Sequence, residues 1–107
     1  MLEVHRVADQ MVDVVVPVID GVERRDRPLA DQLRRALQSV VLNIAEGEKV
    51  SGGNQRLGFE RAAGSNAESR AAVRIAAKWG YIDPGTATAF ERLADQLAAM
   101  LWRLTHR

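Results

Sequence analysis

The segment from Ser39 to Gly47 places a polar line and an apolar stripe side by side on one helix. Ser39, Asn43 and Glu46 recur at positions i, i+4 and i+7, which share a face because each helical residue advances by about 100°. The neighbouring apolar stripe consists of Leu33, Ala36, Leu37, Val40 and Ile44. A helix with adjoining polar and apolar faces must have a defined neighbour on two sides. This constraint points to a packed helical fold.

Composition and length predict one soluble globular domain over residues 1–107. Hydrophobic residues make up 47% of the chain and charged residues 27%, which is typical of a folded domain. Cysteine is absent, which excludes disulfides and thiolate chemistry and fits the reducing cytoplasm. Arg6, Asp9 and Asp13 interrupt the first apolar stretch, so we expect no signal peptide and no membrane segment.

Four segments have the apolar spacing of amphipathic helices. Hydrophobic residues recur at i, i+3 and i+4 over about residues 2–19, 28–47, 54–79 and 83–105, and no segment alternates as a strand does. Short connections between such helices favour antiparallel neighbours. The sequence therefore predicts an all-α fold, an up-down-up-down antiparallel four-helix bundle.

Prolines and glycines predict where these helices begin, bend and end. Pro28 suits the start of the second helix, where no N–H is needed, and Asp83 can cap the fourth helix just before Pro84. Pro17 should kink or end the first helix. Gly47 is expected to end the second helix in the left-handed conformation, before a loop over residues 48–54.

The third predicted helix is apolar on two nearly opposite faces. A single bundle can bury only one of them, so the second face should meet another subunit. Alternatively, its alanines are simply good helix formers in exposed positions. The expected oligomer interface consists of Gly64, Ala71, Ala72 and Ile75.

Two motifs in this chain resemble those of a known family. Residues 39–47 read S-x-x-x-N-I-A-E-G and residues 62–68 read A-x-G-S-x-x-E, and Trp79-Gly80-Tyr81-Ile82 is similar to a closing L-G-Y-[IL] turn. This order and spacing resemble the four-helix bundle proteins, also called 23S rRNA-intervening sequence proteins. Departures from the family pattern occur at Gly58, Arg61 and Ala63, where bulky, apolar and basic residues, respectively, are more common.

The resemblance implies a cyclic homo-oligomer, a homopentamer, as well as the four-helix fold. Some members of the family are encoded inside ribosomal-RNA insertions. A related protein assists the reverse transcriptase of diversity-generating retroelements by binding nucleic acid. Most members have no established activity.

The two motifs supply a candidate polar seam between the second and third helices: Ser39, Asn43, Glu46, Ser65 and Glu68. We favour a structural role, because a buried Asn can fix helix register and oligomeric state. Glu46 opposes the helix dipole by about 0.3–1 kcal/mol in the last turn, so it should have a partner such as Arg61. The alternative is that Glu46 and Glu68 are paired carboxylates for acid–base or metal chemistry.

No catalytic, cofactor or metal site is predicted. Di-metal sites in helical bundles use Glu-x-x-His motifs, whereas Leu2 and Arg103 precede His5 and His106 by three residues. Both histidines lie near the chain ends and should be solvated. Ser65 has no internal histidine to act as its base. We therefore expect a protein that is not an enzyme.

Cations provide the remaining candidate surface, although the net charge is only +1. The chain has thirteen arginines and two lysines, and arginine suits phosphate recognition, but a genome rich in G and C is the simpler explanation of this composition. Cations near a helix C-terminus also favour the dipole within a single subunit. In an oligomer they would form a multivalent surface. The candidate nucleic-acid contacts are Arg70, Arg74 and Lys78 on one helix face, and Arg24, Arg25 and Arg27 around the first loop.

Two functional hypotheses follow. The first is an oligomeric module that binds RNA or DNA through its repeated arginine-rich surfaces. The second is a structural or protein-interaction scaffold without a nucleic-acid role.

Overall fold

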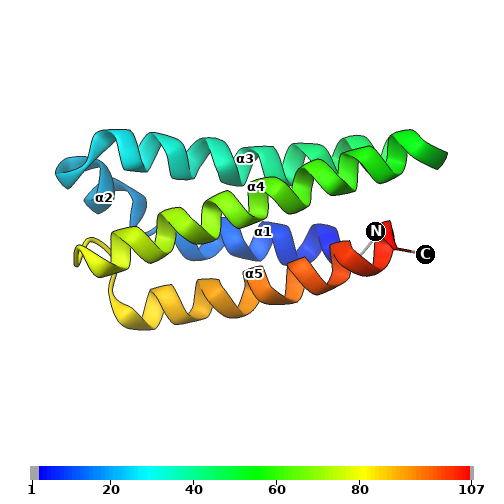
Figure 1. Ribbon diagram of the computed structural model, residues 1–107. Coiled ribbons are helices and arrows are strands. Elements are labelled where there is room, and N and C mark those ends of the chain that lie inside the picture. Colours follow the sequence, from blue (N-terminus) through cyan, green and yellow to red (C-terminus); the bar gives the residue numbers. More distant parts are fainter. Residues whose placement is uncertain (1–2, 107) are drawn as a thin grey trace.

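The computed structural model describes residues 3–106, which form five α-helices and no strand (Figure 1). The helices are α1 (Glu3–Val15), α2 (Ile19–Arg25), α3 (Arg27–Lys49), α4 (Gly52–Lys78) and α5 (Pro84–Thr105). The predicted all-α fold class is confirmed. None of the helices in this range combines the length and apolar character needed to cross a membrane.

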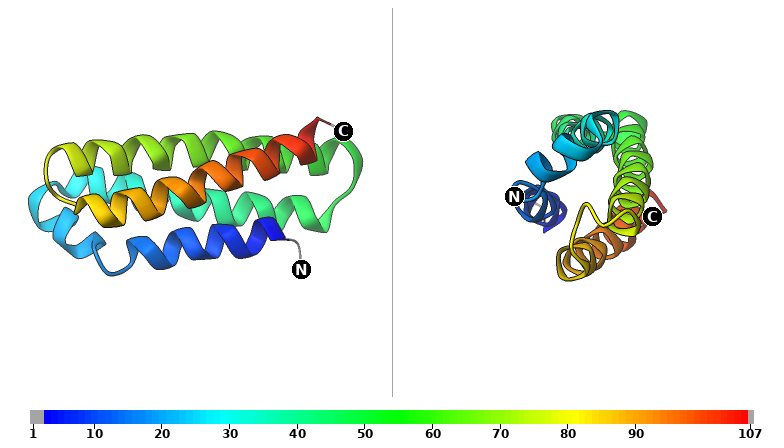
Figure 2. Two further views of the ribbon diagram at one scale, coloured as in Figure 1. Left: turned by 90° about the horizontal axis from the view of Figure 1, so that it is seen from below. Right: turned by 90° about the vertical axis from the view of Figure 1, so that its left-hand side faces the viewer.

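The four long helices surround a common core in a molecule that extends 43 × 22 × 19 Å. Contacts join α1 to α3, α3 to α4, α4 to α5 and α5 back to α1, as the end-on view shows (Figure 2). The short helix α2 packs on α3. It lies at the same end of the molecule as the α4–α5 connection (Figure 1).

The first predicted helix is interrupted at Pro17, which is why the structure has five helices and not four. Helix α1 ends at Val15, and turn hydrogen bonds from Val16 N–H to Val12 O and from Val18 N–H to Val15 O, both 2.9 Å, cover the break. Proline cannot donate the next helical hydrogen bond. The expected break is therefore confirmed, and the residues after it form α2 as a separate helix.

Aspartates cap the helices that begin with proline in the first turn. Asp26 Oδ1 accepts a hydrogen bond from Leu29 N–H at 3.1 Å, and Asp83 Oδ2 accepts one from Thr86 N–H at 3.0 Å. These bonds satisfy amide groups that have no partner within their own helix. The Thr86 hydroxyl also donates to Asp83 Oδ1 at 2.6 Å, and this bond lowers the pKa of Asp83.

The prediction that Gly47 ends its helix is wrong. Helix α3 runs through Gly47 to Lys49, and the predicted loop over residues 48–54 shortens to Val50 and Ser51. Gly47 is needed for close packing and not for a turn, because a Cβ placed on it would lie 3.0 Å from the Phe59 ring. A Cβ on Gly58 would lie 2.9 Å from Gly47 Cα. The backbones of α3 and α4 therefore almost touch at this pair of glycines.

Gly80 adopts the left-handed conformation just after the end of α4. Its φ is 78°, and its N–H donates to Ala77 O at 3.0 Å, while Tyr81 N–H donates to Ala76 O at 2.8 Å. This pair of bonds is a Schellman motif, which satisfies the last carbonyls of a helix. Helix α4 therefore ends sharply, and the chain reverses into α5.

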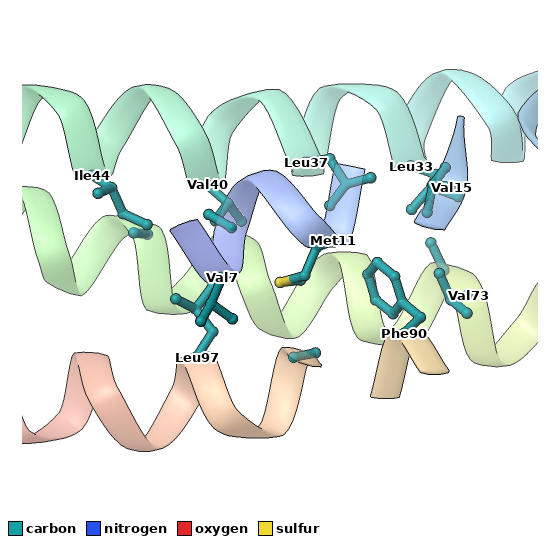
Figure 3. Close-up of a cluster of buried hydrophobic side chains, with 14 of the residues drawn as sticks. Val7, Met11, Val15, Leu33, Leu37, Val40, Ile44, Val73, Phe90 and Leu97 are labelled. Atoms are coloured by element: carbon teal, nitrogen blue, oxygen red, sulfur yellow. The ribbon is translucent and has the colours of Figure 1, made fainter. Parts of the chain in front are cut away.

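The core consists mainly of side chains from all four long helices, joined by Val22 of α2 and Ile82 of the α4–α5 connection (Figure 3). Met11 of α1 and Phe90 of α5 are its largest apolar members together with Phe59 of α4. Figure 3 also shows the apolar stripe of α3 pointing into this core, with Leu33, Leu37, Val40 and Ile44 in sequence along the helix. The apolar stripe of α3 thus packs as its spacing predicts.

Candidate functional site

Three residues of the candidate polar seam are joined by hydrogen bonds between α3 and α4. The hydroxyl oxygens of Ser39 and Ser65 lie 2.7 Å apart. The Asn43 side-chain amide donates to Ser39 O at 2.8 Å and to Ser39 Oγ at 3.0 Å. All three side chains are half-buried. The structure therefore brings Ser39, Asn43 and Ser65 together in a network that links the two helices.

The two carboxylates of the seam do not belong to this network. Glu46 and Glu68 are exposed, and neither forms an ion pair or side-chain hydrogen bond within residues 3–106. Arg61, the partner expected for Glu46, forms neither an ion pair nor a side-chain hydrogen bond with it. Ser39 lies opposite Ser65 and Gly47 opposite Gly58, so Glu46 and Glu68 are separated by about ten helical residues, or about 15 Å.

The geometry contradicts the alternative in which Glu46 and Glu68 act as one carboxylate pair, because acid–base partners must reach the same atoms. Glu68 instead borders a polar hollow of about 320 Å³ between α3 and α4, whose other walls include Arg35, Ser39 and Ser65. Among residues 3–106, no group of three or more His, Asp or Glu side chains is placed to hold a metal ion.

Arg70 differs from the other cations of α4, because α5 supplies it with acidic partners. Its Nη2 lies 2.6 Å from Glu91 Oε1 and 3.6 Å from Asp95 Oδ1. The hydrogen bond to Glu91 raises the pKa of Arg70. Acids that are distant in sequence therefore lie beside Arg70 and neutralise it. Arg74 and Lys78 are exposed and form no ion pair within the described chain.

Arg25 connects the second group of predicted cations to the end of α4. Its Nη1 donates to Gly80 O at 2.9 Å, and its guanidinium carbon lies 5.9 Å from the centre of the Tyr81 ring. Arg24 and Arg27 flank it in sequence, are exposed and form no ion pair within residues 3–106. We use the term basic end for the group Arg24, Arg25, Arg27, Arg74 and Lys78.

Acidic residues near the basic end are partly neutralised by Arg34. Its Nη1 lies 2.7 Å from Glu23 Oε1 and 3.5 Å from Asp31 Oδ1, and its Nη2 lies 3.7 Å from Asp20 Oδ1. The hydrogen bond from Arg34 lowers the pKa of Glu23. Three acidic side chains of this segment, Asp20, Glu23 and Asp31, therefore surround one arginine.

The second apolar face of α4, which the sequence predicts to be an oligomer interface, is exposed except at Ala72. Gly64 is exposed, Ala71 is half-buried and Ile75 has 42% of its surface exposed. Ala72 is only 6% exposed and belongs to the hydrophobic core, so it is not available for contacts with another subunit. Leu57 and Trp79, which the sequence assigns to the same face, are 44% and 69% exposed.

A family model for the 23S rRNA-intervening sequence protein matches residues 1–103. The chain belongs to this family. A solved structure from Bacteroides thetaiotaomicron, described as a protein with unknown function from the S23 ribosomal protein family, superimposes with a TM-score of 0.87. It is 13% identical, and the alignment covers 97% of this chain and 99% of that chain, so the likeness concerns the fold. No curated protein matches the sequence.

The motifs that resemble those of the 23S rRNA-intervening sequence proteins lie where α3 and α4 meet. Residues 39–47 are on α3 and residues 62–68 on α4, and the Ser39–Ser65 hydrogen bond joins the two motifs. Gly58 is one of the positions at which the sequence comparison leads us to expect a departure from the family pattern. In this chain it permits the close approach of α4 to Gly47, which a side chain would prevent.

Sequence reasoning missed a buried polar residue, Asn66, between α4 and α5 of this family member. It is 1% exposed, its amide donates to Ala94 O at 2.9 Å, and its Oδ1 has no hydrogen-bond partner among residues 3–106. Asn66 follows Ala62 by four residues and precedes Val73 by seven, which places it in the apolar stripe. That spacing is the signal that could have identified it.

His5 is also less solvated than expected. Its side chain is 24% exposed, and its Nε2 lies 3.8 Å from Glu48 Oε1 while its Nδ1 lies 4.0 Å from Asp9 Oδ1. This arrangement places the N-terminal part of α1 against the last turn of α3.

Proposed function

We propose that this chain is a non-catalytic subunit of a homo-oligomer that binds RNA or DNA through arginine-rich surfaces repeated around the assembly. Each subunit would be an up-down-up-down four-helix bundle, and the family resemblance implies a pentamer. The non-catalytic part of the proposal is supported by Ser39 and Ser65. Their hydroxyls bond to each other, and the Ser39 hydroxyl also accepts a hydrogen bond from the Asn43 amide, so neither is bonded to a base.

The basic end is the observation that carries the nucleic-acid proposal. Arg24, Arg27, Arg74 and Lys78 are exposed and lack ion-pair partners within residues 3–106. The bond from Arg25 to Gly80 O brings the two groups of cations to the same end of the molecule (Figure 1). Cations without intramolecular partners remain free to contact phosphate, and each contact releases counterions. Arg70 is removed from the candidate contacts because Glu91 neutralises it.

Contacts to phosphate should dominate over base readout. Tyr81 is held beside Arg25, and Trp79 and Trp102 are the only aromatic side chains among residues 3–106 that are largely exposed. Phosphate contacts give affinity without sequence information. We therefore expect little sequence preference.

Replacing Arg24, Arg27, Arg74 and Lys78 together by alanine should weaken RNA binding strongly and reduce its dependence on salt. Each lost phosphate contact lowers the slope of log K against log salt by roughly 0.7–0.9. The measurement is filter binding of a single-stranded RNA at several salt concentrations. The matched control replaces Arg56, Arg61, Arg92 and Arg103, four exposed arginines outside the basic end, and removes the same charge. Equal weakening by both variants would show that only total charge matters.

The exposed face of α4 supports assembly. Ile75 and Leu57 lie on the outer side of a helix whose inner side already packs in the core, and Gly64 between them presents no side chain. A second copy could approach the backbone closely there. Exposed apolar residues that share one helix face are typical of subunit interfaces. Leu42 on α3, 66% exposed, is a further apolar residue that the sequence interpretation did not assign to an interface.

Replacing Ile75 by glutamate should dissociate the assembly while leaving the helical content unchanged. A charge placed in an apolar interface loses hydration without gaining a partner, whereas Ile75 is exposed in the isolated subunit. Light scattering after gel filtration gives the mass, and circular dichroism gives the helical content. Ala99→Glu on the exposed side of α5 is the control and should keep the wild-type mass. A wild-type protein that elutes with the mass of a single chain would exclude this interface.

The scaffold hypothesis is the second candidate, and the same exposed apolar face favours it. Leu57 and Ile75 on this face of α4, together with Leu42 of α3, could contact a different protein as well as a second copy. Assembly without retention of RNA on the filter at low salt would favour this scaffold.

A further inference from the structure

A hollow of about 390 Å³ lies between the last turns of α4 and the first turns of α5. Its apolar lining includes Val73 and Ala77 from α4 and Ala87 and Phe90 from α5. Val73 and Phe90 are otherwise core residues, only 3% and 1% exposed, so the hollow reaches down to the hydrophobic core. A volume of this size falls within the range of small-molecule sites, roughly 300–1,000 Å³.

The rim of the hollow has an asymmetric charge. Arg70 and Glu91 both border it, but they neutralise each other through their 2.6 Å contact. Arg74 and Lys78 border it as well and have no ion-pair partner within residues 3–106. The α4 side of the rim therefore carries two uncompensated positive charges beside an apolar floor.

We infer that this hollow binds a small amphipathic anion, with its apolar part on the floor and its carboxylate or phosphate at Arg74 and Lys78. The stretch of α4 that borders the hollow spans residues 70–78, which is about 12 Å along the helix. That length and the two cations fit a medium-chain carboxylate. The inference does not rest on nucleic-acid binding, because it needs neither a base nor a polynucleotide backbone.

Decanoate is the probe that tests this inference, with decyltrimethylammonium as the ligand of equal tail and opposite charge. Amide chemical shifts of the isotopically labelled full chain are followed during each titration, below the concentration at which the probe forms micelles. We expect saturable shifts from decanoate concentrated at residues 70–78 and 87–91. The cationic probe should bind at least roughly tenfold more weakly, since it loses two charge-assisted contacts.

Two variants separate the charged rim from the apolar floor. Arg74→Glu with Lys78→Glu changes only exposed positions and should weaken decanoate binding by roughly tenfold or more. The control pair, Arg92→Glu with Arg103→Glu, carries the same change of charge on exposed positions that do not border the hollow. Ala77→Phe should fill the floor and also abolish binding.

Binding that follows this pattern supports the site. Absence of saturable shifts, shifts spread over the whole surface, or equal binding of both probes would overturn it. Equal losses in the two double variants would also overturn it, because they would trace binding to net charge. If Ala77→Phe does not fold, the exposed double variant decides the question alone.

Discussion

Replacing Gly58 by valine should lower the free energy of unfolding by about 3 kcal/mol or more, or prevent folding altogether. Any side chain at this position begins with a Cβ, which would lie 2.9 Å from Gly47 Cα and 3.1 Å from both Asn43 O and Gly47 N. All three contacts involve backbone atoms of α3, which cannot move aside by changing rotamer. The two helices would have to separate, and the Ser39–Ser65 hydrogen bond would separate with them. Urea denaturation measures the loss.

Gly53→Val is the matched control for this substitution. Gly53 also lies in α4, but nothing lies within 4 Å of a Cβ placed there. The control should stay within about 0.5 kcal/mol of the wild type, as surface changes usually do. Equal losses in the two variants would mean that the cost arises from valine in the helix and not from the crossing at Gly47.

Changing Asn66 to aspartate should cost about 3 kcal/mol or more at neutral pH. The side chain is 1% exposed and its amide donates to Ala94 O, while its Oδ1 already lacks a hydrogen-bond partner within the described part of the chain. An ionised carboxylate cannot donate to that carbonyl, and its charge would be buried without a counter-ion. Thermal and urea unfolding at several pH values measure this cost.

The cost at Asn66 should depend on pH in a defined direction. Burial raises the pKa of an introduced carboxyl above its unfolded value of about 3.9, so the destabilisation grows as the pH rises above about 4. It should shrink at lower pH, where the carboxyl is protonated in both states. Asn54→Asp, at an exposed position of α4, is the control and should show neither effect. A pH-independent loss in the Asn66 variant would contradict this account.

The helices could be predicted because their causes are local. The apolar stripe of α3, the break at Pro17 and the cap at Asp83 depend on residues within one or two turns. Gly47 shows where local reasoning fails. Its sequence context suggests a helix end, but the reason for glycine there is the backbone of α4 and the Phe59 ring, which are close only in the folded chain.

The candidate site could also be predicted only in part, since some of its contacts are local and others depend on how the helices pack. Helical spacing placed Ser39 beside Asn43, the second motif supplied Ser65 to the same seam, and hydrogen bonds join the three residues in the structure. Spacing could not exclude Glu46 and Glu68 as partners, because their separation depends on the antiparallel register of the two helices. Arg70 looked unpaired along α4, whereas Glu91 comes from the next helix, 21 residues away.

Sedimentation velocity of a fluorescently labelled single-stranded RNA, with the wild-type protein at low and at high salt, tests the central proposal most directly. It reports assembly and nucleic-acid binding in one experiment. At about 50 mM salt, the RNA should sediment with a complex whose mass includes several copies of the chain, and this fraction should fall steeply by about 200 mM. RNA that sediments alone at both salt concentrations would contradict the nucleic-acid proposal, and a complex that contains a single copy would contradict the oligomer.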